Sequence, residues 1–127
     1  MEFTLYAALP ASDIDRAKAW YSEKLGAEPV ESGPGGELRY DIGGSKFGLY
    51  ASAFAGTNQA TAAMLAVSDF DAARAEMRSR GVVFEDYDFG DDFRTVDGVL
   101  QGPNGEKASW FKDSEGNILG LASSDLT

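Results

Sequence analysis

The alternation of hydrophobic and polar positions predicts two helices set among short strands. Apolar side chains recur at helical spacing directly after each of two Ser-Asp pairs. The first helix is predicted to start at Ser12 or Asp13 and to stop at Gly26. The second is predicted to start at Ser68 or Asp69 and to stop at Gly81. The apolar stripes comprise Ile14, Ala17, Tyr21 and Leu25, with Trp20 alongside, in the first helix and Phe70, Ala73 and Met77 in the second.

Apolar or alternating segments outside the helices predict strands. They cover residues 3–9, 27–31, 37–42, 45–51, 60–67, 82–87, 97–101, 107–112 and 117–122. Pro10 closes the first segment, and Gly43-Gly44 joins two segments as a two-residue hairpin. The predicted order is therefore β-α-β-β-β, given twice, with residues 52–59 as the connection.

The two halves also repeat in sequence. The string LPASDIDRAKA from Leu9 matches LAVSDFDAARA from Leu65, with Leu, Ser, Asp, Asp, Ala and Ala in register. Asp13 corresponds to Asp69, a constant offset of 56 residues. Average composition would give about one identity in such a window. The chain therefore reads as a duplicated module, and two similar halves predict a cleft between them.

These strings resemble a known family. A duplicated β-α-β-β-β module is similar to the vicinal oxygen chelate superfamily, which includes glyoxalase I, bleomycin resistance proteins and extradiol dioxygenases. The resemblance rests on ALPASDIDRA from Ala8, on Trp20-Tyr21 with Leu25-Gly26, and on WFKDSEGNIL from Trp110. The last string is similar to the family's Asp-Pro-Asp-Gly-Asn hairpin. A dimeric ferredoxin-like α/β barrel is disfavoured, because it requires neither the offset nor three strands after each helix.

The resemblance implies an α+β fold in which tandem modules form a curved mixed β-sheet around a cleft. Residues 1–127 are then one glyoxalase/bleomycin resistance-like domain, with modules at approximately 1–55 and 60–127. It also implies a homodimer, as is common in the family.

The family's metal positions carry poor ligands in this sequence. The resemblance places them at Tyr6, at Leu49 or Tyr50, near Ala62 and at Gly120. Divalent metals require several carboxylate, imidazole or carbonyl donors about 2 Å from the ion. The sequence therefore predicts neither a metal site nor a cofactor, and it nominates no catalytic residue.

Small and aromatic residues at these positions instead favour a pocket for an organic compound. The predicted ligand-binding residues are Tyr6, Tyr40, Tyr50, Trp110, Ala62 and Gly120. Arg94 lies in a segment rich in aspartate and aromatic residues. It is expected to neutralise neighbouring aspartates more than to hold an anionic ligand.

Composition and charge exclude several function classes. The chain has 127 residues, a net charge of −10 and neither cysteine nor histidine. Nucleic acid and anionic membranes would repel such a chain, and disulfide, thiolate or imidazole chemistry is unavailable to it. The start of the sequence has no basic leader and no apolar run long enough for a membrane span, so a cytoplasmic location is expected.

Three functional hypotheses remain. The first is a metal-free protein that binds a hydrophobic or aromatic small molecule. The second is a lyase, isomerase or dioxygenase of the same superfamily, with a relocated metal or a metal-free mechanism in which Tyr6 is the acid–base residue. The third is a non-catalytic protein whose halves serve mainly dimerisation.

Overall fold

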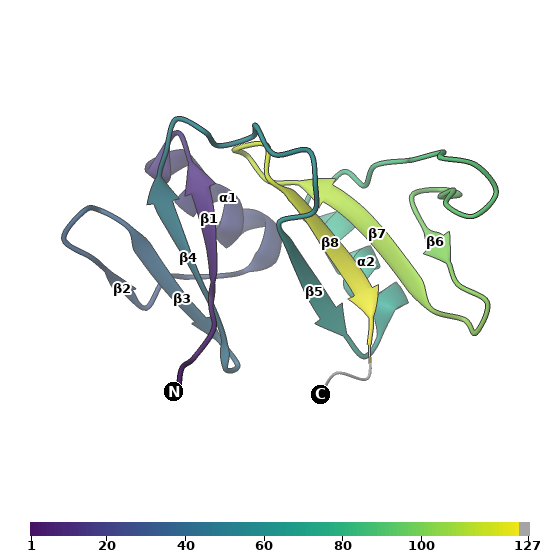
Figure 1. Ribbon diagram of the computed structural model, residues 1–127, viewed down its shortest axis with the longest axis horizontal. Helices are drawn as coiled ribbons and strands as arrows, with labels where there is room; N and C mark the ends of the chain where they lie inside the picture. Colours follow the sequence, from purple (N-terminus) through teal and green to yellow (C-terminus); the bar gives the residue numbers. More distant parts are fainter. Residues whose placement is uncertain (125–127) are drawn as a thin grey trace. The chain divides into compact units, whose positions relative to one another are not determined.

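Two helices and eight strands follow one another as β-α-β-β-β twice in residues 1–124, the part of the chain that the computed structural model describes (Figure 1). The predicted fold class is therefore confirmed. The predicted second module, 60–127, extends three residues beyond the described part. No helix among the described residues is long and apolar enough to span a membrane.

The chain divides into two compact units, close to the predicted boundary between the modules. Unit 1 contains residues 1–60 together with 113–117, and unit 2 contains residues 61–112 with the chain from Ile118 onward. The turn at 113–117 therefore belongs to unit 1, although the strands on both sides of it belong to unit 2. The cleft expected between the two halves stays a prediction.

Unit 1 holds a four-stranded mixed sheet in the order β1-β4-β3-β2. β1 runs parallel to β4, and the other neighbouring strands are antiparallel. Its elements are β1 (Ala7–Ala11), α1 (Ile14–Leu25), β2 (Glu31–Ser32), β3 (Leu38–Ile42) and β4 (Ser45–Ala51). The Gly43-Gly44 hairpin between β3 and β4 is present as predicted, because both glycines adopt the positive φ that such a turn requires.

Unit 2 repeats this arrangement in the order β5-β8-β7-β6, with β5 parallel to β8. Its elements are β5 (Ala63–Val67), α2 (Phe70–Ser79), β6 (Leu100–Gln101), β7 (Lys107–Lys112) and β8 (Ile118–Ser123). The aspartate of the repeated Ser-Asp pair has the same capping role in both units. Asp13 and Asp69 each cap a helix by accepting a hydrogen bond of 3.0 Å from the backbone N–H three residues on.

Each sheet buries one face against its own helix. In unit 1 the buried face of the sheet carries Leu9, Leu49 and Tyr40, and Leu9 is paired with Leu49 in register. Tyr21 is buried on the α1 side of the same core. In unit 2 the corresponding core residues are Phe70, Met77, Phe111, Leu119 and Leu121. Because side chains alternate along a strand, the residues between these point to the opposite face. We call the face opposite the unit's own helix the distal face.

Several predicted strands are longer than those observed: β5 begins at Ala63 and β6 covers only Leu100–Gln101, and three further strands differ as follows. β1 begins at Ala7 and continues through Pro10, which the sequence analysis placed at its end. Proline is tolerated there because β1 is an edge strand, paired only with β4. The strand predicted at 27–31 is reduced to β2, and that at 82–87 to a single bridge between Phe84 and Phe111. Both segments lie beside a sheet edge, where packing rather than local sequence decides pairing.

Candidate ligand-binding site

The distal face of unit 2 brings together two of the predicted binding residues. Trp110 on β7 pairs with Gly120 on β8, and Gly120 pairs in turn with Met64 on β5. The Met64 thioether occupies the space that a side chain at position 120 would enter. The Trp110 indole Nε1 donates a hydrogen bond of 3.1 Å to the Thr61 hydroxyl, which fixes the ring at this face. Ala62 lies exposed just before β5, and its N–H donates to the carbonyl of Ile118 at 2.8 Å.

Three further aromatic rings assemble around Trp110. Tyr87 and Phe93 contact Trp110 with ring centroids 6.0 and 5.4 Å away, and Phe89 contacts both, at 5.9 and 5.6 Å. The four side chains therefore form a closed circuit of ring contacts, here called the aromatic cluster (Tyr87, Phe89, Phe93 and Trp110). Trp110, Tyr87 and Phe93 are half-buried, whereas Phe89 is 75% exposed. The cluster thus offers an exposed ring supported by three fixed ones.

The other predicted residues lie in unit 1 and separate onto two faces. Tyr6 is 59% exposed, and its ring lies over Gly48 on the distal face, where Tyr50 is 42% exposed. Tyr40 points the opposite way. It is 2% exposed and stacks on Phe47 at 4.4 Å in the core under α1. Tyr6 and Tyr50 therefore share the distal face of unit 1, whereas Tyr40 is buried on the face that packs against α1.

The residues at the family's metal positions do not fit a divalent cation. Tyr6 supplies a phenol, and Ala62 and Gly120 supply no side-chain donor at all. At Gly120 the nearest side-chain atoms belong to Met64, whose thioether is a poor ligand for a hard cation. Within residues 1–124, no three Asp or Glu side chains gather closely enough to hold a metal ion. No catalytic step through a metal is therefore derived.

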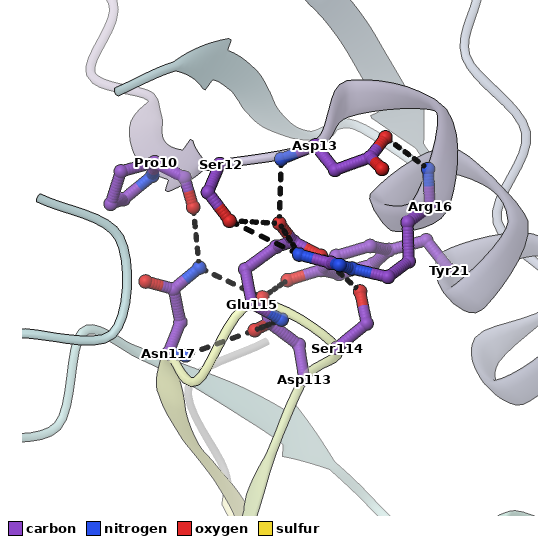
Figure 2. Close-up of polar contacts among 9 residues, drawn as sticks. All are labelled: Pro10, Ser12, Asp13, Arg16, Tyr21, Asp113, Ser114, Glu115 and Asn117. Carbon is purple, nitrogen blue, oxygen red and sulfur yellow. Dashed lines mark hydrogen bonds and ion pairs between the residues drawn. The ribbon is translucent and has the colours of Figure 1, made fainter. Parts of the chain in front are cut away.

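A separate buried polar network surrounds Glu115 in unit 1 (Figure 2). The Glu115 side chain is fully buried, and its carboxylate accepts hydrogen bonds from Arg16 Nε at 2.9 Å and Arg16 Nη2 at 3.0 Å. It also accepts from the Asp13 N–H at 2.9 Å and from the hydroxyls of Ser12 and Ser114. These contacts tie the 113–117 turn to the start of α1. The repeated Ser-Asp motif therefore serves the scaffold in the first unit.

Asp113 and Asn117 complete the same network. The Asp113 carboxylate accepts from the Tyr21 hydroxyl at 2.6 Å and from the N–H groups of Glu115 and Asn117 at 2.9 Å. The Asn117 amide donates to Asp113 and to the carbonyl of Pro10 on β1, at 2.9 and 2.8 Å (Figure 2). All of these polar groups are paired, as buried polar groups must be.

Electrostatics exclude Glu115 as a proton donor near neutral pH. Hydrogen bonding from Arg16 lowers its pKa to about 2, against the opposing effect of burial. The carboxylate is thus ionised, enclosed and fully occupied by donors. A general acid or base needs a pKa near the working pH and access to substrate, and Glu115 has neither. The network is structural.

Two buried tyrosines provide a matched test of this interpretation. Tyr21→Phe removes the bond to Asp113 and is expected to lower the free energy of unfolding by about 2 kcal/mol. Tyr40→Phe is expected to change it by less than about 0.5 kcal/mol, because the buried Tyr40 hydroxyl has no hydrogen-bond partner among residues 1–124. Urea denaturation of both variants measures the difference, and equal losses would contradict it.

A cavity of about 690 Å³ lies elsewhere in unit 2, between α2 and residues 81–98. Arg74 and Arg78 line it together with Asp86 and Asp97. The Arg74 guanidinium lies over the Phe84 ring at 5.0 Å and donates to the Asp97 carbonyl. Hydrogen bonds from Thr95 and Gly98 lower the pKa of Asp86. Two cations face two anions in this cavity, so its charge favours no particular ligand.

Arg94 behaves as the sequence suggested, with a different set of partners. Its guanidinium lies 3.4 Å from Asp88 and 3.2 Å from Asp91. Both pairs are solvent-exposed, so they contribute little to stability. Arg94 is the only basic residue in the sequence from 85 to 97, and its guanidinium is engaged by these two aspartates.

Comparison with known proteins identifies the family. The family model of the Glyoxalase/Bleomycin resistance protein/Dioxygenase superfamily matches residues 4–121, so the chain belongs to this superfamily. No functionally curated protein matches the chain.

Solved structures show the same fold at low identity. The chain is similar to UcmS2, with 22% identity and a TM-score of 0.75, covering 98% of this chain and all of that one. It is also similar to lactoylglutathione lyase from Agrobacterium tumefaciens, at 18% identity and a TM-score of 0.72, covering 99% and 96% of the two chains. A third is a variant of the fosfomycin resistance protein FosX from Listeria monocytogenes, complexed with Mn(II) and a dihydroxypropylphosphonic acid. It has 17% identity and a TM-score of 0.66, with 99% and 94% coverage.

Sequence reasoning missed two parts of this picture. Tyr87, Phe89 and Phe93 were not among the predicted binding residues, although aromatic and acidic residues alternate visibly from 86 to 89. The link between Arg16 and Glu115 was also missed, because 99 residues separate the two. Arg16 and Glu115 each lie in a string that supported the family resemblance, but neither string indicates that the two residues are in contact.

Proposed function

We propose that this protein is a metal-free, small-molecule-binding member of its superfamily, with a site for a hydrophobic or aromatic organic compound. The observation that carries the proposal is the distal face of unit 2. There the family's ligand positions hold Ala62 and Gly120, and an aromatic cluster stands beside them. An apolar surface with a few fixed polar groups suits an organic ligand better than an ion.

The predicted binding residues are assigned as follows. Trp110 supports the proposal most strongly, because its ring joins two other rings of the cluster and its N–H is already held by Thr61. At Gly120 the adjoining space is filled by Met64, an adaptable side chain that a ligand could displace, and Ala62 adds only a methyl group. Tyr6 and Tyr50 are proposed as secondary contacts on the distal face of unit 1. Tyr40 contributes packing instead.

A calorimetric screen of aromatic compounds against dialysed protein tests the proposal. At least one compound is expected to bind, and Trp110→Leu is expected to weaken it about tenfold by removing a stacking surface. Phe54→Leu is the matched control, since Phe54 is 77% exposed in unit 1 and outside the cluster. Metal analysis of the same sample separates this proposal from a lyase or dioxygenase. A stoichiometric ion that survives dialysis, or a screen without any binder, would overturn it.

We further propose a cytoplasmic homodimer. The strongly acidic, cysteine-free composition suits the cytoplasm. Phe3 and Leu5 are 78% and 85% exposed and precede β1, the edge strand of its sheet, so they offer apolar surface to a second chain. Sedimentation at micromolar concentration tests the dimer, and a monomer would refute it.

A further inference from the structure

We propose that the aromatic cluster selects planar organic cations over neutral or anionic compounds of the same shape. This inference rests on the proposed function and specifies the charge of its ligand. It depends on two independent features of unit 2, namely how the four rings are arranged and which charges surround them.

The first feature is the arrangement of the four rings, of which one is exposed. Tyr87 and Phe89 are nearly parallel, at 18°, whereas Phe93 and Trp110 are tilted by 43°. The faces of aromatic rings carry partial negative charge and attract cations, most strongly in tryptophan. Phe89 is the most exposed member, at 75%, and therefore presents its ring to a ligand. A planar cation stacked there gains both dispersion and cation–π attraction.

The second feature is the charge of the segment that carries three of the rings. Residues 85–97 contain six acidic side chains and one basic side chain, Arg94. Asp86 and Asp97 line the cavity beside α2, and Glu85 lies 3.7 Å from Lys112, so the acidic side chains that remain for the cluster are those of residues 88–92. Asp88 and Asp91 already hold the Arg94 guanidinium, at 3.4 and 3.2 Å. Asp92 is exposed in the same segment. A cation bound at the cluster lies in this negative potential, which extends over roughly 8 Å at physiological salt.

An anionic ligand finds no comparable support at the cluster. Arg94 is occupied by its two aspartates, and Lys112 on β7 lies 3.7 Å from Glu85. Arg74 contacts Phe84 and lines the cavity beside α2, not the distal face. A neutral ring keeps the stacking contribution and loses the electrostatic one. The geometry therefore ranks cation above neutral above anion.

Three probes of matched shape test this ranking by calorimetry on the full-length protein: N-methylquinolinium, 1-methylnaphthalene and 1-naphthoate. The cation is expected to bind about fivefold or more tightly than the neutral probe. Raising NaCl from about 20 mM to about 500 mM is expected to reduce the difference in affinity between the cation and the neutral probe, since salt screens exposed charges. The anion is expected to bind least.

Two variants locate the effect. Asp92→Lys is expected to weaken N-methylquinolinium binding about threefold while leaving the neutral probe unchanged. Asp15→Lys is the matched control, because it changes net charge equally from an exposed position on α1. Phe89→Leu is expected to weaken the cation more than the neutral probe, because it removes an exposed ring without opening the core.

The outcomes distinguish the two proposals. If the cation binds no more tightly than the neutral probe, or if Asp92→Lys and Asp15→Lys weaken it equally, the charge preference is wrong and the proposed binding function stands. If none of the three probes binds, and no compound in the broader screen does, the proposed function fails as well.

Discussion

Glu115→Ala is expected to lower the free energy of unfolding by about 3 kcal/mol. The physical reason is that the Glu115 carboxylate is fully buried and accepts hydrogen bonds from five donor groups. Two of these groups are Nε and Nη2 of Arg16. Truncation leaves the Asp13 N–H without its acceptor and opens a space beneath the first turn of α1. Domains of this size are stable by about 5–15 kcal/mol, so the loss is a large fraction of the total.

Urea denaturation measures this loss, and Glu76→Ala is the control. Glu76 forms an ion pair of 3.5 Å with Arg80 on the surface of α2, with its own side chain 66% exposed. Exposed pairs of this kind contribute less than about 1 kcal/mol. A loss at Glu115 no larger than the loss at Glu76 would show that the network does not hold the 113–117 turn.

Lowering the pH is expected to reduce the contribution of Glu115 to the free energy of unfolding. The pKa of Glu115 is lowered from 4.5 to about 2 in the folded protein, chiefly by hydrogen bonding from Arg16. A carboxylate whose pKa falls on folding stabilises the protein above its unfolded pKa and loses this contribution as the pH drops toward its folded pKa. The stability difference between wild type and Glu115→Gln is therefore expected to be largest near neutral pH and to shrink between about pH 5 and pH 2. A difference independent of pH would contradict the ion pair.

Gly56→Ala is expected to cost about 3 kcal/mol, although Gly56 lies in an exposed segment between the two modules. Its φ of +76° is strained for a residue with a side chain. A Cβ there would also lie 2.7 Å from the backbone carbonyl oxygen of Glu115 and 3.5 Å from the Gly116 Cα. The obstructing atoms are backbone in a turn fixed by the Glu115 and Asp113 contacts, so they cannot move aside cheaply.

Gly36→Ala is the control that separates the cost of backbone strain from the cost of the steric clash at residue 56. Gly36 has a similar φ of +82°, but a Cβ there would meet nothing within 4 Å. Its cost is expected to be about 1 kcal/mol, the usual penalty for a left-handed residue. Chemical denaturation of both variants gives the comparison. Equal costs would mean that the approach of residue 56 to the 113–117 turn does not constrain the fold.

Both predictions concern the scaffold of unit 1. The Glu115 network lies in unit 1, and the aromatic cluster lies in unit 2. Substitutions at Glu115 and Gly56 therefore change no residue of the proposed binding site.

The sequence by itself determined the elements and their duplication. The helix starts at Asp13 and Asp69, the Gly43-Gly44 hairpin and the strands β7 and β8 all follow from local signals, namely capping residues, turn glycines and alternation. The sequence also predicted poor metal ligands at Ala62 and Gly120, because neither residue type has a side-chain atom that can bind a metal.

Only the tertiary structure decided which face each strand residue occupies and which distant residues meet. Strand register placed Tyr40 in the core. The folding of segments outside the strands placed Tyr6 over Gly48 and gathered Tyr87, Phe89 and Phe93 near Trp110. A shift of one residue in strand register moves every side chain of the strand to the other face of the sheet. The sequence of a short strand therefore does not specify which of its residues face the core. The pairing of Arg16 with Glu115 likewise depends on chain folding over 99 residues, because hydrogen bonds require proximity in space, which local sequence patterns do not specify.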